Sequence, residues 1–497
     1  MKTPTAFLRL VSAAAFAGTL TAAVALPAAA QVDLTRIAFV GDSEGAGFSS
    51  GCLTKRVQVD SPGAIIARTA GVDFQQPIVN DPGLGGCLVL TSLAPSFTRE
   101  ASTGTPANLS LPRPYNNLSI PGCAIGDMVR ATTAAETQSA GACRLFIDLV
   151  LRNSALHIGS PIAQAVALNP TFVFLENVGN DYLGALLSGT VIDGVTVTPI
   201  ASFTADINTA LTTLKNKQPK GIVFGVADIT SIPFATTLPP FLTSGGKLVL
   251  NPATGAPIPL LGPKGCPTGV PACPIPANTI VTLNAAGYLP SGFGIPCAVA
   301  PTLPNCNKPL PAAALDATHP GALIYAADVA FLKSRGAEYN AAIQAAATAT
   351  GYKYYDVNDF LLRLKAGFDI GGATVNANFL TGGAFSYDGF HLTPIGYALL
   401  ADDVIQFMNA NFAAGLPRVN LSTYLFNGGT AGGLSGSSAL YVPLNGEDYE
   451  RGVQGIFTLD FSRQLASMFS LSKPALVQGD GDMVPRVEPR HRGIEQP

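Results

Sequence analysis

Four short apolar runs, separated by helix-like stretches, constrain the fold of this chain more than any other feature. The apolar runs lie at 34–40, 171–176, 221–226 and 352–357. The helix-like stretches lie at 61–70, 143–168, 201–217, 323–347 and 393–412. Strands that alternate with helices predict βαβ units, whose crossovers place helices on both faces of a parallel sheet. The pattern therefore predicts an α/β fold built on a mainly parallel sheet.

The composition excludes several other classes of protein. The 497 residues are 47% hydrophobic and 12% charged, so the chain can bury a large core and is not globally disordered. Its formal net charge is −3, and nucleic-acid binding is not expected without clustered Lys and Arg. A long coiled coil is excluded, because the chain has 52 Gly and 39 Pro and few charges.

The first segment, 1–30, has the features of a secretory signal peptide. Lys2 and Arg9 supply a short positive region, an apolar stretch follows, and an Ala-Ala-Ala sequence ends at Ala30. We expect cleavage near Ala30 and a mature protein that is secreted or periplasmic. A membrane anchor is the alternative interpretation of this segment.

All eight cysteines lie beyond this segment. In an oxidising compartment an even number of cysteines predicts disulfides. Sequential pairing, in which each cysteine joins the next, closes the shortest loops, although many other pairings are open. Zinc is not expected, because the spacings are wide and the chain has four histidines. We expect no metal ion and no other cofactor. The cysteines are Cys52, Cys87, Cys123, Cys143, Cys266, Cys273, Cys297 and Cys306.

Two regions depart from the strand–helix alternation. Residues 228–320 are dense in Pro and Gly and hold four of the cysteines, which predicts a disulfide-tied insertion that could serve as a lid. A Pro-rich disordered linker is the alternative for this region. Residues 417–497 have a sparse apolar pattern. We expect strands within 420–470 and disorder in the last fifteen or so residues.

Polar residues follow the first two apolar runs. Ser43 lies in Gly-Asp-Ser at the end of the first run, where open parallel sheets place their ligands, although an ordinary turn has the same composition. Asn180 follows the second run, and its amide could donate to developing negative charge or make an Asx turn or helix cap. A loop at 117–124 contains Gly122, whose N–H could be aimed at a bound group.

Two Asp-x-x-His sequences are candidates for an acid–base pair. An Asp three residues before a His can accept from the imidazole and leave its other nitrogen to act as a general base. Asp388 and His391 have this spacing, and so do Asp316 and His319. The second pair lies at the end of the Pro-rich region, which disfavours a catalytic role, but spacing alone does not choose between them.

Together these residues resemble, in their order along the chain, the SGNH or GDSL-type serine hydrolases. The matching motifs are GDSEGAGF at 41–48, NLSIPGCA at 117–124, VGND at 178–181 and DGFHLTPIGYALLAD at 388–402. The resemblance covers about 34–415 and favours His391 over His319. It implies a flavodoxin-like three-layer α/β/α sandwich with a mainly parallel sheet. The implied hydrolase domain spans 31–416, contains the insertion 228–320, and precedes a C-terminal extension at 417–497.

The resemblance also implies the roles of the site residues. Ser43 would be the nucleophile, His391 the general base, and Asp388 the residue that orients His391. The N–H groups of Ser43 and Gly122 and the side-chain amide of Asn180 would form the oxyanion hole. The implied activity is that of an exported esterase or lipase, which cleaves carboxylic esters through an acyl-enzyme on Ser43.

Two residues beside the predicted site, Glu44 and Cys123, could affect its chemistry. The family usually has a leucine after the nucleophile, where this chain has Glu44. We expect Glu44 to point to solvent, and the alternative is that its charge acts on His391. Cys123 directly follows Gly122, so a disulfide from Cys123 would stiffen the oxyanion loop.

Several functions share these residues. The low charge and the Pro-rich insertion fit an apolar acyl group, and the absence of Trp weighs against a sugar substrate, so we expect a small-molecule or lipid ester. A carbohydrate acetylesterase is one alternative. A non-catalytic surface binding or adhesion protein on the same scaffold, associated with a membrane or cell surface, is another. A metal-dependent hydrolase is not expected, and the sequence does not predict an oligomeric state.

Overall fold

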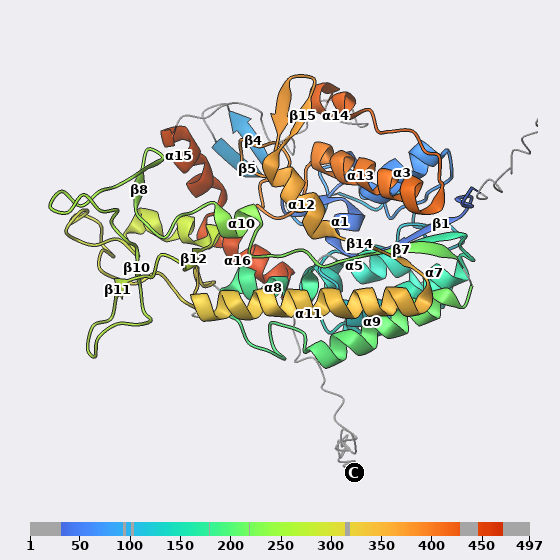
Figure 1. The fold of residues 1–497 in the computed structure, drawn as a ribbon, viewed down its shortest axis with the longest axis horizontal. Coiled ribbons are helices and arrows are strands. Elements are labelled where there is room, and N and C mark those ends of the chain that lie inside the picture. The colour runs from blue at the N-terminus through green and yellow to red at the C-terminus, as the bar shows by residue number, and fades with distance from the viewer. Residues whose placement is uncertain are drawn as a thin grey trace, which may run out of the picture.

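The computed structural model describes residues 31–92, 96–100, 104–177, 179–217, 219–313, 319–427 and 446–470. The predicted signal peptide lies outside these residues, and so do Asp316, Val178 and the end of the chain that was expected to be disordered. The described residues form an α/β structure around one parallel sheet (Figure 1).

The sheet has four strands, and all its neighbouring pairs are parallel. In spatial order the strands are β1 (Ile37–Val40), β6 (Phe172–Leu175), β7 (Lys220–Phe224) and β14 (Lys353–Tyr355). The four strands predicted from the apolar runs are therefore confirmed.

A further extended segment continues the sheet beyond β1. The Phe39 N–H donates to Asn116 O at 2.8 Å, and the Leu118 N–H donates to Phe39 O at 2.7 Å, as in a parallel strand. When this segment is counted as the second strand, the spatial order is 2-1-3-4-5 in chain numbering. This order reverses direction between β1 and β6, and open α/β sheets bind ligands at such a point.

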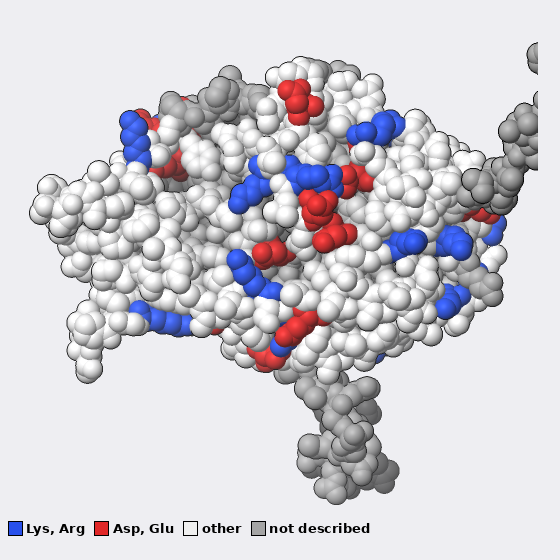
Figure 2. All heavy atoms as spheres, in the orientation of Figure 1, with Lys and Arg blue, Asp and Glu red and all other residues white. Residues whose placement is uncertain are grey.

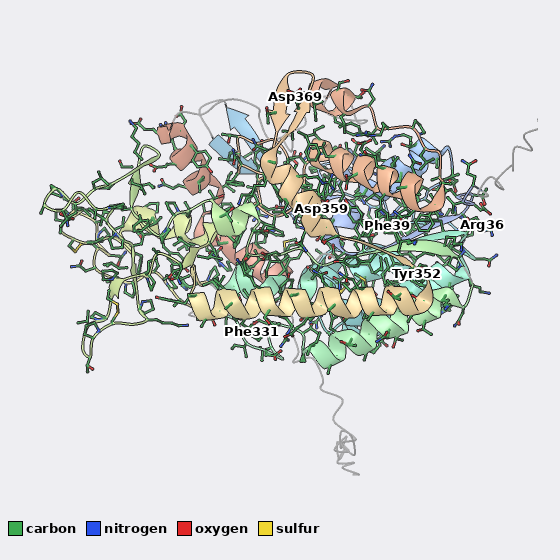
Figure 3. The ribbon with its side chains drawn as sticks, viewed as in Figure 1. Arg36, Phe39, Phe331, Tyr352, Asp359 and Asp369 are labelled. Atoms are coloured by element: carbon green, nitrogen blue, oxygen red, sulfur yellow. A yellow bond between two sulfur atoms is a disulfide. The ribbon has the colours of Figure 1, made fainter. Side chains whose placement is uncertain are left out.

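Both faces of the sheet are buried, which explains the nearly continuous apolar runs. Along β1, Ile37 and Phe39 pack into the core on one face, whereas Ala38 and Val40 pack into the core on the other. Figure 3 shows Phe39 in the interior of the molecule, between the helices of the two layers. The protein therefore has three layers, with the sheet in the middle.

Each face is covered by its own set of helices (Figure 1). One layer contains α3 (Pro62–Ala70), α12 (Val357–Ala366), α13 (Pro394–Phe412) and α14 (Leu421–Asn427). The other contains α4 (Ile125–Arg130), α5 (Ala142–Leu151), α7 (Pro161–Ala167), α8 (Asn180–Ser188), α9 (Ile200–Lys215) and α11 (Ala326–Thr350). The five predicted helical stretches are confirmed, with one difference in 143–168.

That stretch is divided into α5, a short α6 (Asn153–Leu156) and α7. Arg152 ends α5 in the left-handed conformation, with φ 50°. Ser160 then starts α7 by accepting from the Ala163 N–H, and Pro161 occupies the first turn. A serine cap followed by proline is a strong start signal, so the chain forms separate helices here.

Short elements connect these layers. Near β1 they are α1 (Ser43–Ala46), β2 (Phe48–Ser49), β3 (Cys52–Leu53), α2 (Lys55–Gln58), β4 (Leu88–Ser92), β5 (Ser96–Arg99) and a 3-10 turn at Ala134–Glu136. Between α12 and α13 there is a hairpin of β15 (Phe368–Ile370) and β16 (Ala373–Val375).

The region 228–320 is a compact insertion with a small core of its own. Its elements are α10 (Pro233–Thr236), β8 (Thr243–Ser244), β9 (Lys247–Leu248), β10 (Leu261–Gly262), β11 (Cys273–Pro274), β12 (Ile280–Val281) and 3-10 turns at Leu283–Gly287 and Leu289–Ser291. β12 pairs with β13 (Leu323–Ile324), just beyond the insertion. Its role as a lid stays a prediction.

Four disulfides join the eight cysteines, and the sequential pairing is confirmed. The bonds are Cys52–Cys87, Cys123–Cys143, Cys266–Cys273 and Cys297–Cys306. The last two tie the insertion. Four disulfides are compatible with an exported protein. Within the described part of the chain, no helix is both long enough and apolar enough to cross a membrane.

The expectation of strands within 420–470 is wrong for the described residues, which are helical. Besides α14 they form α15 (Gly446–Ile456) and α16 (Leu459–Met468). The buried residues of α16 include Phe461, Leu465 and Met468, which recur at spacings of four and three and so lie on one helical face. Thr458 caps this helix by accepting from the Phe461 N–H.

Candidate active site

Ser43 is the first residue of α1, immediately after β1. The Asp42 side chain caps this turn by accepting from the Glu44 N–H at 3.1 Å. The backbone turns sharply here, and a Cβ at Gly45 would lie 2.5 Å from Ser119 Oγ, so this position has no room for a side chain. The sequence thus holds Ser43 at the carboxyl end of a central strand, as predicted.

Glu176, at the end of β6, fixes the loop that carries Ser43. Its Oε2 atom accepts the N–H of Asp42 at 3.0 Å and the N–H of Gly45 at 3.1 Å. Burial, followed by the neighbouring Asp42, raises the pKa of the Glu176 carboxyl well above its ordinary value. Glu176 was not among the predicted site residues, although an acidic residue that ends a buried strand is a signal that could have found it.

His391 and Asp388 form a buried pair. The two side chains join through Nδ1 and Oδ2 at 2.8 Å, and both residues are about fully buried. Asp388 also accepts the Gly51 N–H at 3.1 Å and the Ser386 hydroxyl at 2.9 Å. Burial alone would raise the pKa of the Asp388 carboxyl, but the charge and side-chain hydrogen bond of His391, together with the N–H groups of His391 and Phe390, lower it below its ordinary value. An ionised Asp388 therefore accepts from Nδ1.

The second imidazole nitrogen of His391 is available for proton transfer. With the proton on Nδ1, Nε2 has a free lone pair. Nε2 is buried and has no hydrogen-bond partner among the described residues. Three phenyl rings surround the imidazole, with centroid distances of 4.3 Å for Phe390, 4.8 Å for Phe48 and 5.3 Å for Phe469. A buried polar nitrogen without a partner costs free energy, so its presence calls for an explanation such as a functional role.

Ser43, His391 and Asn180 line one pocket, with a cavity volume of about 60 Å³. Ser43 and Asn180 converge because β1 and β6 are adjacent and end at the same edge of the sheet, whereas His391 comes from the segment before α13. The rest of the lining is mostly apolar and includes Ile229 and Phe360. The site therefore combines a few polar side chains, among them Ser43, Asn180 and His391, with an apolar wall.

The predicted oxyanion residues are only partly brought together. Asn180 starts α8, and its Nδ2 donates to Cys123 O at 3.2 Å, so it lies beside the loop of Gly122. The Ile120 N–H donates to Gly41 O at 2.9 Å and ties this loop to the Ser43 turn. Gly122 has φ 78° and belongs to this loop, but it is not among the described residues that line the pocket.

The expectation that Glu44 points to solvent is wrong. The residue is 9% exposed and lines the same pocket as Ser43. Burial, followed by the charges of Asp42 and Asp388, raises the pKa of the Glu44 carboxyl well above its ordinary value. The sequence could not reveal this, because the burial of Glu44 depends on the later segment around Leu392 that folds against it.

The competing histidine lies elsewhere. His319 is partly buried and does not line the pocket of Ser43, while its neighbour Asp316 lies outside the described residues. The described part of the chain contains one group of side chains close enough to hold a metal ion, namely Cys123, Asp127 and Cys143. Its cysteines are joined to each other, so they offer no thiolate.

No protein-family model, no curated protein and no solved structure matches this chain. The chemistry of the site is therefore argued from its geometry. A serine, a histidine with one nitrogen held by an ionised aspartate, and a side-chain amide donor are the groups that acyl transfer requires.

Proposed function

We propose that this protein is an exported serine ester hydrolase of the SGNH type, which cleaves carboxylic esters through an acyl-enzyme on Ser43. One observation carries the proposal. His391 has Nδ1 held by Asp388 at 2.8 Å and a buried Nε2 without a partner, and it lines the same pocket as Ser43. A serine hydroxyl is a poor nucleophile until a base removes its proton, and in this proposal His391 is that base.

The proposed reaction has two steps, acylation of Ser43 and hydrolysis of the resulting acyl-enzyme. His391 Nε2 takes the proton of Ser43 Oγ while Oγ forms a bond to the ester carbonyl carbon. The resulting oxyanion accepts from the Ser43 N–H and the Asn180 amide, and from the Gly122 N–H once the loop is aligned on the substrate. The imidazolium then returns its proton to the leaving alcohol as the ester C–O bond breaks. Water, activated by the same nitrogen, releases the acid and regenerates Ser43.

The lining of the pocket supports an apolar acyl substrate. Leu183, Ile232 and Phe360 are among the residues that enclose the space beside Ser43. The face shown in Figure 2 has scattered charges, and few lie on the insertion at its left. A lipid or fatty-acyl ester fits these surfaces better than an acetylated sugar does. The strand order 2-1-3-4-5 supports the flavodoxin-like architecture that the resemblance implies.

Hydrolysis of 4-nitrophenyl esters, from acetate to palmitate, tests the proposal. We expect the wild-type protein to be active, and Ser43→Ala and His391→Ala to lose activity while they keep the circular dichroism spectrum of the wild type. His319→Ala is the matched control and should remain active. Inactive, correctly oxidised wild-type protein would favour the binding or adhesion alternative, and activity in Ser43→Ala would exclude Ser43 as the nucleophile.

A further inference from the structure

We propose that Phe469 is a positioning residue for His391, and that through this residue the C-terminal segment 446–470 supports the active site from outside its pocket. This inference rests on the proposed function. The segment lies outside the part of the chain that resembles the hydrolase family, and Phe469 lies one residue beyond α16. No sequence motif assigns Phe469 a role, but its contacts connect it to the site.

The first contact is with the catalytic imidazole. Phe469 is 2% exposed, and its ring centroid lies 5.3 Å from that of His391. Phe469 also meets Phe48 and Phe390 edge to face, at 5.7 and 5.4 Å. Because Phe48 and Phe390 contact the imidazole too, the three phenyl rings form one packed cluster around it. Removal of any of these rings would leave space into which the imidazole could tilt.

The second contact supports the partner of His391. A Cβ built on Gly51 would lie 3.0 Å from Cε2 of Phe461, in the first turn of α16. The Gly51 N–H donates to Asp388 Oδ2, the same oxygen that accepts from His391. The two ends of α16 therefore lie against the surroundings of both members of the Asp388–His391 pair.

The third contact is with the two elements that carry the predicted oxyanion donors. A Cβ at Gly122 would lie 3.0 Å from Met468 O, and one at Gly184 of α8 would lie 2.6 Å from Phe469 O. The Ala140 N–H donates to Ser470 O at 2.8 Å and secures the end of the segment. The backbone of 468–470 thus packs against the Gly122 loop and against the helix that begins at Asn180.

These contacts suggest how Phe469 would act. Asp388 fixes Nδ1, but a single hydrogen bond leaves the imidazole free to tilt about that bond. Phe469 and its two neighbours limit this tilt and hold Nε2 in one direction. Phe469 would therefore affect the orientation of the His391 imidazole and not the affinity for substrate, because Phe469 does not line the described pocket. Misplacement of a catalytic group by about 1 Å can cost up to 10²-fold in rate.

Three full-length variants test the inference. Phe469→Ala removes the ring, and Phe469→Leu restores most of its volume. Phe457→Ala is the matched control, because Phe457 is a buried phenylalanine of the same segment whose ring contacts Phe234, Phe379 and Phe461. For each variant, the concentration of active sites would be titrated with a fluorophosphonate. The kcat, KM and unfolding midpoint would then be measured.

We expect Phe469→Ala to lower kcat per titrated site about 10-fold or more with KM changed less than twofold. Phe469→Leu should recover most of the rate. Phe457→Ala should lower the unfolding midpoint and leave kcat per titrated site unchanged. An unchanged kcat in Phe469→Ala, or an equal loss in Phe457→Ala, would overturn the inference.

A second measurement separates this inference from the proposed function. Diethyl pyrocarbonate modifies accessible imidazole nitrogens, and peptide mapping follows His391 without any need for turnover. We expect slow modification of His391 in the wild type and in Phe457→Ala, and faster modification in Phe469→Ala. Equal rates in all three would show that Phe469 does not hold the imidazole, whereas a wild type that cleaves no ester would overturn the proposed function alone.

Discussion

Glu176 holds the turn of Ser43 through Gly45, whose N–H donates to Glu176 Oε2 at 3.1 Å. The same oxygen accepts the Asp42 N–H, so one side chain at the end of β6 secures both flanks of Ser43. These two hydrogen bonds join the end of β6 to the turn that follows β1, where the polar residues of the site lie. The site therefore depends on buried hydrogen bonds to the backbone as well as on the side chains that line its pocket.

We predict that Glu176→Ala destabilises the protein by about 2–4 kcal/mol, because two buried N–H groups lose their acceptor. Glu176→Gln keeps a side-chain oxygen for both donors and should cost less than about 1.5 kcal/mol. Urea unfolding of the two variants beside the wild type measures the difference. Equal stabilities for Glu176→Ala and the wild type would show that these hydrogen bonds do not secure the turn.

A second prediction concerns pH and Glu44. A carboxyl group whose pKa is raised on folding binds more protons in the folded state than in the unfolded state. Its contribution to stability is therefore present at low pH and is lost as the pH rises above the ordinary glutamate value. Glu44→Gln removes this titration, so its free energy of unfolding should decline less than that of the wild type between pH 5 and pH 8. The difference is at most about 1.4 kcal/mol per pH unit.

Unfolding titrations at intervals across that pH range would measure this effect. Glu176 titrates in the same direction, so some pH dependence should remain in the variant. Parallel curves for Glu44→Gln and the wild type would contradict a buried, neutral Glu44.

A third prediction concerns Asp388. In Asp388→Asn the side chain keeps its size but can present an amide N–H to His391 Nδ1 in place of a carboxylate oxygen. The imidazole would then carry its proton on Nε2 and could not act as a base. We expect kcat to fall about 10⁴-fold with the fold retained. Steady-state kinetics beside circular dichroism test this, and a loss of less than tenfold would argue against the assigned role of Asp388.

A fourth prediction concerns the disulfide next to Gly122. Replacing both Cys123 and Cys143 with alanine should lower stability by about 2–4 kcal/mol and also lower kcat, because the oxyanion loop becomes less constrained. The matched control replaces Cys297 and Cys306 in the insertion, where we expect kcat to stay within twofold of the wild type. If the variant without the Cys123–Cys143 bond has the same kcat as the wild type and as the control variant, this bond has no part in positioning the loop.

The sheet and its helices could be predicted because local patterns determine them. Strands buried on both faces require continuous apolar runs, and the end of such a strand places Ser43 and Asn180 at one edge. Sequential pairing of the cysteines could be suggested because it closes the shortest loops, although the sequence left other pairings open. These features depend on neighbours in the sequence or on one simple topology.

The burial of Glu44 and the position of Phe469 could not be predicted in this way. Each depends on a contact between segments that are far apart in the chain and share no pattern. The helices of 446–470 were missed for a different reason, because the three- and four-residue spacing of Phe461, Leu465 and Met468 is visible in the sequence. This helical spacing was the signal in the sequence. In the structure, the apolar face of α16 lies against the site.

Covalent labelling of the native protein with a fluorophosphonate, followed by peptide mapping, tests the central claim most directly. The account predicts one phosphonyl group on Ser43 of the wild type, none on Ser43→Ala, and much slower labelling of His391→Ala. The control His319→Ala should label at the wild-type rate. Labelling of another residue, or of folded Ser43→Ala at the wild-type rate, would contradict the assignment of Ser43 as the nucleophile.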